Sequence, residues 1–454
     1  MLRPTRLPVA VRNPVSLIGI VVATTMAMLF VVLFVLEIRG YVTSPYIGLL
    51  VFVAIPAVFV VGLLLIPVGA WRAGRRRRLA PENEPDWPVL DFRNPHQRAA
   101  FAAVLLLTIV NLLIVSMAAY GGVRYMESSE FCGEVCHTTM EPQYAAHEGW
   151  PHARVPCAGC HVGPGAGALL ESKLAGTRQL FQVATGRVAM PIPSPVDSLR
   201  PARETCEQCH WPEKFHGDKI RMFREYGGDD ANTESVTTMQ LHVGGGSRAL
   251  GGGSGIHWHM NLDNQIEYVA TEATRETIPY VRLTGRDGRV REYVVEGTTE
   301  AQVAGGTRRQ MDCMDCHNRP AHTFYATPER AVDAAIAQGR IPRELALARR
   351  EAVAAVGSEY GDRTAAFEGI ARRLRDFYSG QAGTDARLVA RAVAAAQDVW
   401  SRNVFPAMNV GWGTYPNHLG HIDAPGCFRC HDDEHKAADG SLIRQDCELC
   451  HKIQ

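Results

Sequence analysis

Residues 131–161 read FCGEVCHTTMEPQYAAHEGWPHARVPCAGCH and contain one short pattern twice, a pair of cysteines followed directly by a histidine. Four more copies follow, and the six together use all twelve cysteines of the 454-residue chain. Five copies have the spacing C-x-x-C-H, whereas the first, CGEVCH, has one additional residue. In chain order, motifs 1 to 6 are Cys132/Cys136/His137, Cys157/Cys160/His161, Cys206/Cys209/His210, Cys313/Cys316/His317, Cys427/Cys430/His431 and Cys447/Cys450/His451.

This pattern is typical of covalent haem attachment. Two thiols add to the two vinyl groups of one haem, and the adjacent imidazole binds the iron as the proximal ligand. Zinc ribbons also use C-x-x-C pairs, but they need no histidine directly after each second cysteine. A disulfide framework predicts nothing about the next residue. The sequence therefore predicts six covalently bound haem c groups and a role in electron transfer.

The remaining histidines are candidates for the second axial ligands. Seventeen histidines less the six in the motifs leave eleven, of which His96 precedes the third apolar stretch. The other ten are enough to make every iron six-coordinate, which favours electron transfer over an open substrate site. A ligand can serve a haem distant in sequence, so pairs are not assigned. The candidates are His147, His152, His216, His257, His259, His322, His418, His421 and His435; of these, His257 and His259 are expected on one face of a strand.

Three uncharged apolar stretches lie in the first quarter of the chain, at 15–36, 46–70 and 99–120. Each exceeds the about 20 helical residues that cross a hydrocarbon core, so three transmembrane helices are predicted. The first is long for a signal peptide and lacks a small-residue cleavage site, so we expect it to be retained.

Arginine sets the expected orientation. Arg3, Arg6 and Arg12 precede the first stretch and Arg72 with the run 75–78 follows the second, which favours a cytoplasmic amino terminus. After three crossings the haem motifs would lie in the periplasm of a multi-pass protein of the bacterial inner membrane. The formal net charge of zero gives no indication of nucleic-acid binding, and we expect none.

Composition divides the chain into five segments. The β-branched and aromatic residues before position 300 predict a small antiparallel insert, with a hairpin at GRDGR, and the Ala- and Arg-rich stretch 328–400 predicts two or three helices. The expected fold is a membrane-anchored multihaem cytochrome c, with three transmembrane helices before a haem-organised, loop-rich α domain that carries this insert. The segments are 1–125 (membrane anchor), 126–225 (three haem motifs), 226–310 (β-rich insert), 311–400 (motif 4 and helices) and 401–454 (motifs 5 and 6).

Residues 131–180, followed by LRPARETCEQCHWPEKFHGDK at 199–219, resemble the NapC/NirT family of membrane-anchored multihaem quinol dehydrogenases. The resemblance covers about residues 100–225 and includes the third apolar stretch. It implies electron transfer from menaquinol or ubiquinol at the bilayer surface to a periplasmic redox protein. It also implies that a methionine after motif 1 binds iron and that a lysine after motif 2 lies at the quinol pocket. Met140 and Lys173 match these positions, with Glu141 or Glu148 as a nearby acid.

Several alternatives stay open at this point. The additional residue in motif 1 leaves either His137 or Met140 as its axial ligand, and Lys173 could be a solvated charge on a helix. Simple family members have one transmembrane helix and four haems, whereas this chain is expected to have three helices and six haems. Residues 226–454 match the simple members poorly and more closely resemble the extended members. A terminal reductase of a small oxyanion, or a redox wire or sensor without its own quinol site, are the rival functions. Contact with membrane lipid is expected, and a homo- or hetero-oligomer is left open.

Overall fold

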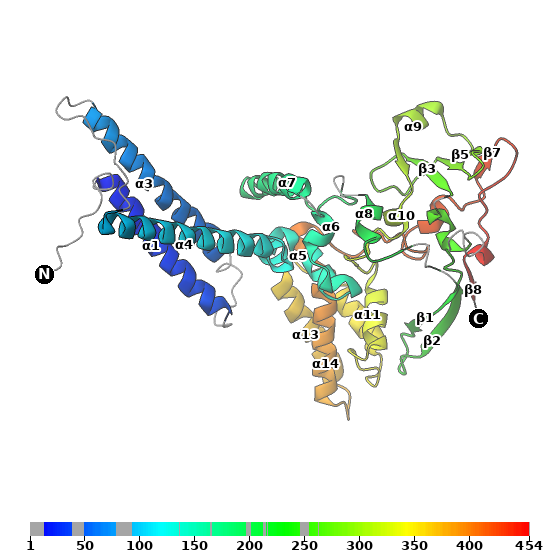
Figure 1. The fold of residues 1–454 in the computed structure, drawn as a ribbon. Helices are drawn as coiled ribbons and strands as arrows, with labels where there is room; N and C mark the ends of the chain where they lie inside the picture. Colours follow the sequence, from blue (N-terminus) through cyan, green and yellow to red (C-terminus); the bar gives the residue numbers. More distant parts are fainter. Residues whose placement is uncertain are drawn as a thin grey trace. The chain divides into compact units, whose positions relative to one another are not determined.

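A computed structural model of the chain describes residues 13–38, 50–78, 93–135, 137–163, 166–196, 201–211, 215, 217–245, 254–261 and 263–453. The chain divides into two compact units, Met1–Cys136 and His137–Gln454 (Figure 1). The first unit is helical, and the second combines helices with two small sheets.

The first unit contains three helices that are long and apolar enough to cross a membrane. They are α1 (Pro14–Ile38), α3 (Ile55–Arg78), which follows a short π-helical turn at Leu50–Ala54, and α4 (Pro95–Met126). The three predicted spans are therefore confirmed, and the third helix is longer than its apolar stretch.

Small residues allow α1 and α3 to pack closely. A Cβ atom added to Gly19 would lie 2.7 Å from the carbonyl oxygen of Gly62, so neither position accommodates a larger residue without movement. The Ser16 hydroxyl donates to the Ile66 carbonyl oxygen over 2.8 Å. Close backbone approach and interhelical hydrogen bonds are the main sources of helix association in lipid, where apolar burial contributes little.

A four-helix group forms the largest core of the second unit. Its buried side chains include Trp400, Ile370 and Leu374, and Asp362 and Asp385 cap the amino termini of two of the helices. The predicted helical stretch is confirmed, with four helices rather than two or three. These are α11 (Pro328–Ala337), α12 (Ala348–Val356), α13 (Arg363–Ser379) and α14 (Ala386–Ser401).

Two antiparallel sheets correspond to the predicted β insert. The larger has the order β6-β3-β4-β5-β7, and the predicted hairpin is confirmed because Thr284 pairs with Val290 across the turn. The smaller has the order β1-β2-β8. Each sheet takes its last strand from the carboxyl-terminal 20 residues, which brings motifs 5 and 6 to the insert. The strands are β1 (Lys219–Tyr226), β2 (Glu234–Leu241), β3 (Gln265–Ala270), β4 (Tyr280–Thr284), β5 (Val290–Val295), β6 (Thr307–Gln310), β7 (His435–Ala437) and β8 (His451–Ile453).

One local prediction was wrong. His257 and His259 do not lie on a strand but in a 3₁₀ turn at Ile256–Met260. Gly255 precedes this turn with a φ of 67°, a left-handed conformation that interrupts extended backbone. The two imidazoles therefore do not share one face by strand alternation, and each is free to meet a different partner.

Candidate haem centres

Motifs 2 to 6 each form a short helical turn. The turns are α6 (Cys157–His161), the end of α8 (Ala202–Cys206) with the residues after it, α10 (Cys313–Cys316), and the 3₁₀ turns Gly426–Arg429 and Cys447–Leu449. In motifs 3, 4 and 5 the histidine backbone N–H donates to the carbonyl oxygen of the first cysteine over 2.8, 2.8 and 3.0 Å. One turn of helix thus gathers two sulfur atoms and an imidazole, as covalent attachment of one haem requires.

Motif 1 falls on the boundary between the two units. Cys132 lies in a π-helical turn at Phe131–Val135, Cys136 lies outside the described residues, and His137 begins α5 (His137–Glu148). Met140 is half-buried on the same helix, one turn later. The choice between His137 and Met140 as iron ligand stays a prediction.

The cysteines of motifs 2 to 6 lie close to one another in sequence order. Burial raises the pKa of the Cys160 thiol, and charge on Cys157 and Cys209 adds to the rise, so motif 2 lies beside motif 3. A hydrogen bond with Cys313 is the main cause that raises the pKa of Cys206, so motif 3 lies beside motif 4.

The series continues toward the carboxyl terminus. Burial raises the pKa of Cys316 to about 12, with charge on Cys427 as the next cause, which joins motif 4 to motif 5. Burial also raises the pKa of Cys450, and Cys427 again contributes, which joins motif 5 to motif 6. Motifs 2 to 6 therefore follow one another in space in the order of the sequence.

Each histidine of motifs 2 to 6 faces a second histidine from elsewhere in the chain. The ring centres lie 5.8 to 6.3 Å apart. With metal–nitrogen bonds of about 2.0 Å and about 1.1 Å from each nitrogen to its ring centre, two imidazoles on one iron have centres about 6.2 Å apart. The five pairs fit that requirement: His161 with His322, His210 with His152, His317 with His257, His431 with His259, and His451 with His421.

Backbone carbonyls orient four of these second histidines. The Nδ1 atoms of His152, His322, His257 and His259 lie 2.8, 2.9, 3.0 and 2.7 Å from the carbonyl oxygens of Pro320, Gln143, Val243 and Ile256. A carbonyl only accepts, so Nδ1 carries the proton and the Nε2 lone pair is left to bind metal. Sequence reasoning missed these carbonyl partners, because any residue type supplies one.

Burial favours the neutral form of five of the ten paired imidazoles, and the neutral form is the one that binds iron. Burial lowers the pKa of His322 to about 4 and also lowers the pKa values of His257, His259, His161 and His317.

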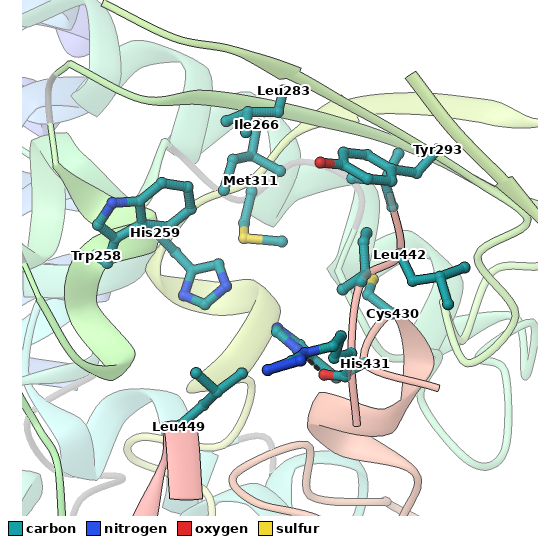
Figure 2. Close-up of a pocket in the computed structure, with 13 residues that line it drawn as sticks. Trp258, His259, Ile266, Leu283, Tyr293, Met311, Cys430, His431, Leu442 and Leu449 are labelled. Carbon is teal, nitrogen blue, oxygen red and sulfur yellow. Dashed lines mark hydrogen bonds between the residues drawn. The ribbon is translucent and has the colours of Figure 1, made fainter. Parts of the chain in front are cut away.

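A cavity of about 300 Å³ surrounds the pair formed by His259 and His431 (Figure 2). The Cys430 side chain also reaches it. The rest of its lining is mainly apolar and includes Trp258, Ile266, Met311, Leu442 and Leu449, which suits a porphyrin face.

Other candidate histidines are placed differently. The Nε2 atom of His147 lies 3.1 Å from the Val155 carbonyl oxygen, although its ring centre is 6.0 Å from that of His322. His418 is buried, and its Nε2 has no hydrogen-bond partner among the described residues. His216 lies outside the described residues.

His435 is fully buried, but both of its ring nitrogens are occupied. Nδ1 is 2.9 Å from the Asp432 carboxylate and Nε2 is 2.7 Å from the Ile278 carbonyl oxygen. We therefore leave His435 out of the proposed iron ligands.

The predicted quinol-site residues lie on two helices of the second unit. Glu141 on α5 forms an ion pair of 3.1 Å with Arg363 at the start of α13. Lys173 lies on α7 (Ala166–Ala184), and Glu148 ends α5 with an exposed side chain. None of the contacts among the described residues joins Lys173 to Met140 or Glu141.

Comparison with known proteins connects both units to one family. Residues 94–191 match the N-terminal region of the NapC/NirT cytochrome c family. The chain is 42% identical over 448 residues to the cytochrome c-type protein ImcH of Geobacter sulfurreducens, an alignment that covers 97% of this chain and 88% of that protein. No solved structure matches the chain.

Proposed function

Because the chain belongs to the NapC/NirT cytochrome c family, we propose that it oxidises membrane quinol and passes the electrons through six haem c groups to a periplasmic redox protein. Membership itself establishes a membrane-anchored multihaem cytochrome of the inner membrane, with covalently bound haem c and a role in electron transport. Quinols and redox proteins are the general partners of the family. The number of haems, the quinol site and the acceptor are the proposed part.

The series of histidine pairs carries this proposal. Each of motifs 2 to 6 has a second imidazole at the distance that suits one iron between the rings. An iron with two axial imidazoles has no open position for a substrate, which favours electron transfer over reduction of a small oxyanion at these centres.

When bound, each haem supplies an iron that cycles between the ferric and ferrous states. The chain's residues hold the imidazoles, exclude water and set the distance to the next centre. Charge taken up at motif 1 would then move along the series to motif 6. The motif 6 cysteine Cys447 is exposed, as is Cys209 of motif 3, and we assign the acceptor protein to the motif 6 end of the series.

At the input end, we assign motif 1 to the first haem and Lys173 to the quinol headgroup. A lysine ammonium is a mobile hydrogen-bond donor that can orient a quinol oxygen. A carboxylate near the quinol can accept the proton of the quinol hydroxyl. Glu141 and Glu148 are the two candidates for that acid. The Glu141 carboxylate is shared with Arg363, whereas Glu148 is exposed.

Two measurements on the full-length protein test the proposal. Intact-protein mass should exceed the polypeptide mass by six haems, and a quinol analogue should reduce the haems in membranes in a manner that a quinol-site inhibitor blocks. A mass excess of fewer than six haems would overturn the count. Haem reduction that ignores quinol and its inhibitor would instead favour a wire or sensor without a quinol site.

A further inference from the structure

Helix α7 exposes apolar surface that the rest of its unit does not cover. Five of its large side chains are between 42% and 65% exposed: Leu170, Leu174, Leu180, Phe181 and Val183. Figure 1 shows α7 standing clear of the four-helix group and of both sheets of the same unit. A group of exposed apolar side chains on one helix is typical of a contact with a membrane or a partner protein.

Four of the five exposed residues gather on one side of the helix, and Val183 near its end lies on the other side. Leu170, Leu174 and Phe181 are spaced by four and seven residues, and at about 100° per residue they fall within one narrow sector. Leu180 extends this sector, and Lys173 projects between Leu180 and Leu170. The opposite side carries Glu171, Gln179 and Gln182.

The apolar side contains few unsatisfied polar groups. The Thr177 hydroxyl, which lies within the same sector, donates to the Lys173 carbonyl oxygen over 2.8 Å. The Thr185 hydroxyl at the helix end donates to the Phe181 carbonyl oxygen over 2.7 Å. Both hydroxyls therefore already form hydrogen bonds within the helix, so transferring them out of water costs little free energy.

The helix is tethered to the unit on both sides. Motif 2 precedes it, and after it the side chains of Val188 and Ile192 pack against a core formed by Phe324, Phe405, Met408 and Tyr415. The Tyr415 hydroxyl donates to the Ile192 carbonyl oxygen over 3.0 Å. The segment that follows α7 is thus anchored in the core of the same unit.

Charge points to the bilayer as the partner. Residues 166–187 contain three basic side chains, Lys173, Arg178 and Arg187, and one acid, Glu171. A helix with one apolar side and basic flanks is suited to an anionic lipid surface. The chain also carries three membrane-spanning helices, so lipid is always present beside it.

We propose that the side of α7 formed by Leu170, Leu174, Leu180 and Phe181 lies in the headgroup region of the bilayer. This lipid contact stands on the exposed residues alone.

Lipid photolabelling of the full-length holoprotein tests this contact. The protein would be placed in nanodiscs of phosphatidylethanolamine and phosphatidylglycerol that contain a phospholipid with a diazirine near its glycerol. Mass spectrometry would then locate the adducts residue by residue. We expect labels on Leu170, Leu174 and Phe181 and few on Gln179 and Gln182.

A matched pair of variants sharpens the test. Because interfacial binding scales with buried apolar area, L170S/L174S/F181S should lower labelling of α7 at least about fivefold, whereas Q179S/Q182S should leave it within about twofold. Equal labelling of both sides, no labelling, or attachment of α7 to a second protein chain would overturn the proposal. The unmodified protein decides the question even if the triple variant does not assemble.

The labelling pattern does not depend on quinol chemistry. Loss of quinol-driven haem reduction with face-specific labelling intact would overturn the proposed function and leave the lipid contact standing. Normal quinol oxidation without face-specific labelling would overturn the lipid contact and leave the proposed function standing.

Discussion

Two regions beside motif 5 show what separates a proposed iron ligand from a structural histidine. His259 uses one ring nitrogen for the Ile256 carbonyl and turns the other into an apolar cavity, where His431 lies 5.8 Å away (Figure 2). His435 is buried more deeply than His259, but a carboxylate and a carbonyl take both of its nitrogens. Burial and closeness to a motif therefore do not make a ligand; a free nitrogen with a partner at metal-binding distance does.

His435 has a different task. Nδ1 lies beside the Asp432 carboxylate and Nε2 beside the Ile278 carbonyl oxygen, so both ring nitrogens are used in hydrogen bonds within the fold. Against the opposing effect of burial, the hydrogen bond from His435 lowers the pKa of Asp432. The pair fastens β7 to the backbone just before β4.

The largest effect is expected from His259→Ala. The iron at motif 5 would lose its second imidazole, so one haem should become high-spin and its reduction potential should move by on the order of 0.1 V, because axial ligands spread haem potentials over about 0.8 V. Magnetic circular dichroism and a redox titration measure both changes. An unchanged low-spin spectrum would remove His259 from the ligand set.

His435→Gln is the matched control for that variant. Leaving the hydrogen-bond partners of a buried side chain unsatisfied costs about 1–3 kcal/mol, so the unfolding temperature should fall while every haem stays low-spin. Thermal unfolding followed by circular dichroism gives the stability. The contrast between the two histidines fails if this variant also produces a high-spin haem.

A spectroscopic difference is expected between neighbouring centres. The ring planes of His257 and His317 are 3° apart, whereas those of His259 and His431 are 78° apart. Parallel and crossed imidazoles split the iron d orbitals differently, so the two ferric haems should give distinct electron paramagnetic resonance signals.

Two single variants assign these two signals. His257→Ala should remove the signal of the parallel pair, and His259→Ala should remove that of the crossed pair. Loss of the same signal in both variants would show that the two histidines serve one haem.

The smallest stability effect is expected at the exposed ion pair of Glu141 with Arg363. The two side chains are 44% and 60% exposed, so Glu141→Gln should change stability by about 1 kcal/mol or less, in contrast to the buried pair of His435. Its effect on quinol-driven haem reduction decides its other role. If Glu141 accepts the quinol proton, the rate should fall at least about tenfold. Glu148→Gln is the matched variant. If both variants reduce the haems at the rate of the unmodified protein, neither acid accepts the quinol proton.

Sequence alone predicted the local chemistry but not the pairing. Cysteines and the adjacent histidine lie within one helical turn, so their joint role follows from spacing. The second histidines come from elsewhere: His152 precedes motif 2 yet faces motif 3, and His322 follows motif 4 yet faces motif 2. Only the tertiary fold brings these segments together, so neighbourhood in sequence was a poor guide.

The same limit explains two other outcomes. The three-residue strands β7 and β8 are too short to give a periodic pattern, and they form only because longer strands offer free edges. His257 and His259 alternate in sequence as a strand would, but the turn that begins after Gly255 overrides that pattern.

The most direct test of the account is a ligand count by near-infrared magnetic circular dichroism on the oxidised full-length protein. Haems with two histidine ligands and haems with histidine and methionine give separate bands, so the count can be compared with the five pairs in the structure. The account predicts that the haems at motifs 2 to 6 each have two histidine ligands. The haem at motif 1, whose ligand is His137 or Met140, is not included in these five. Fewer than five haems with two histidine ligands, or a dominant high-spin signal, would contradict the account.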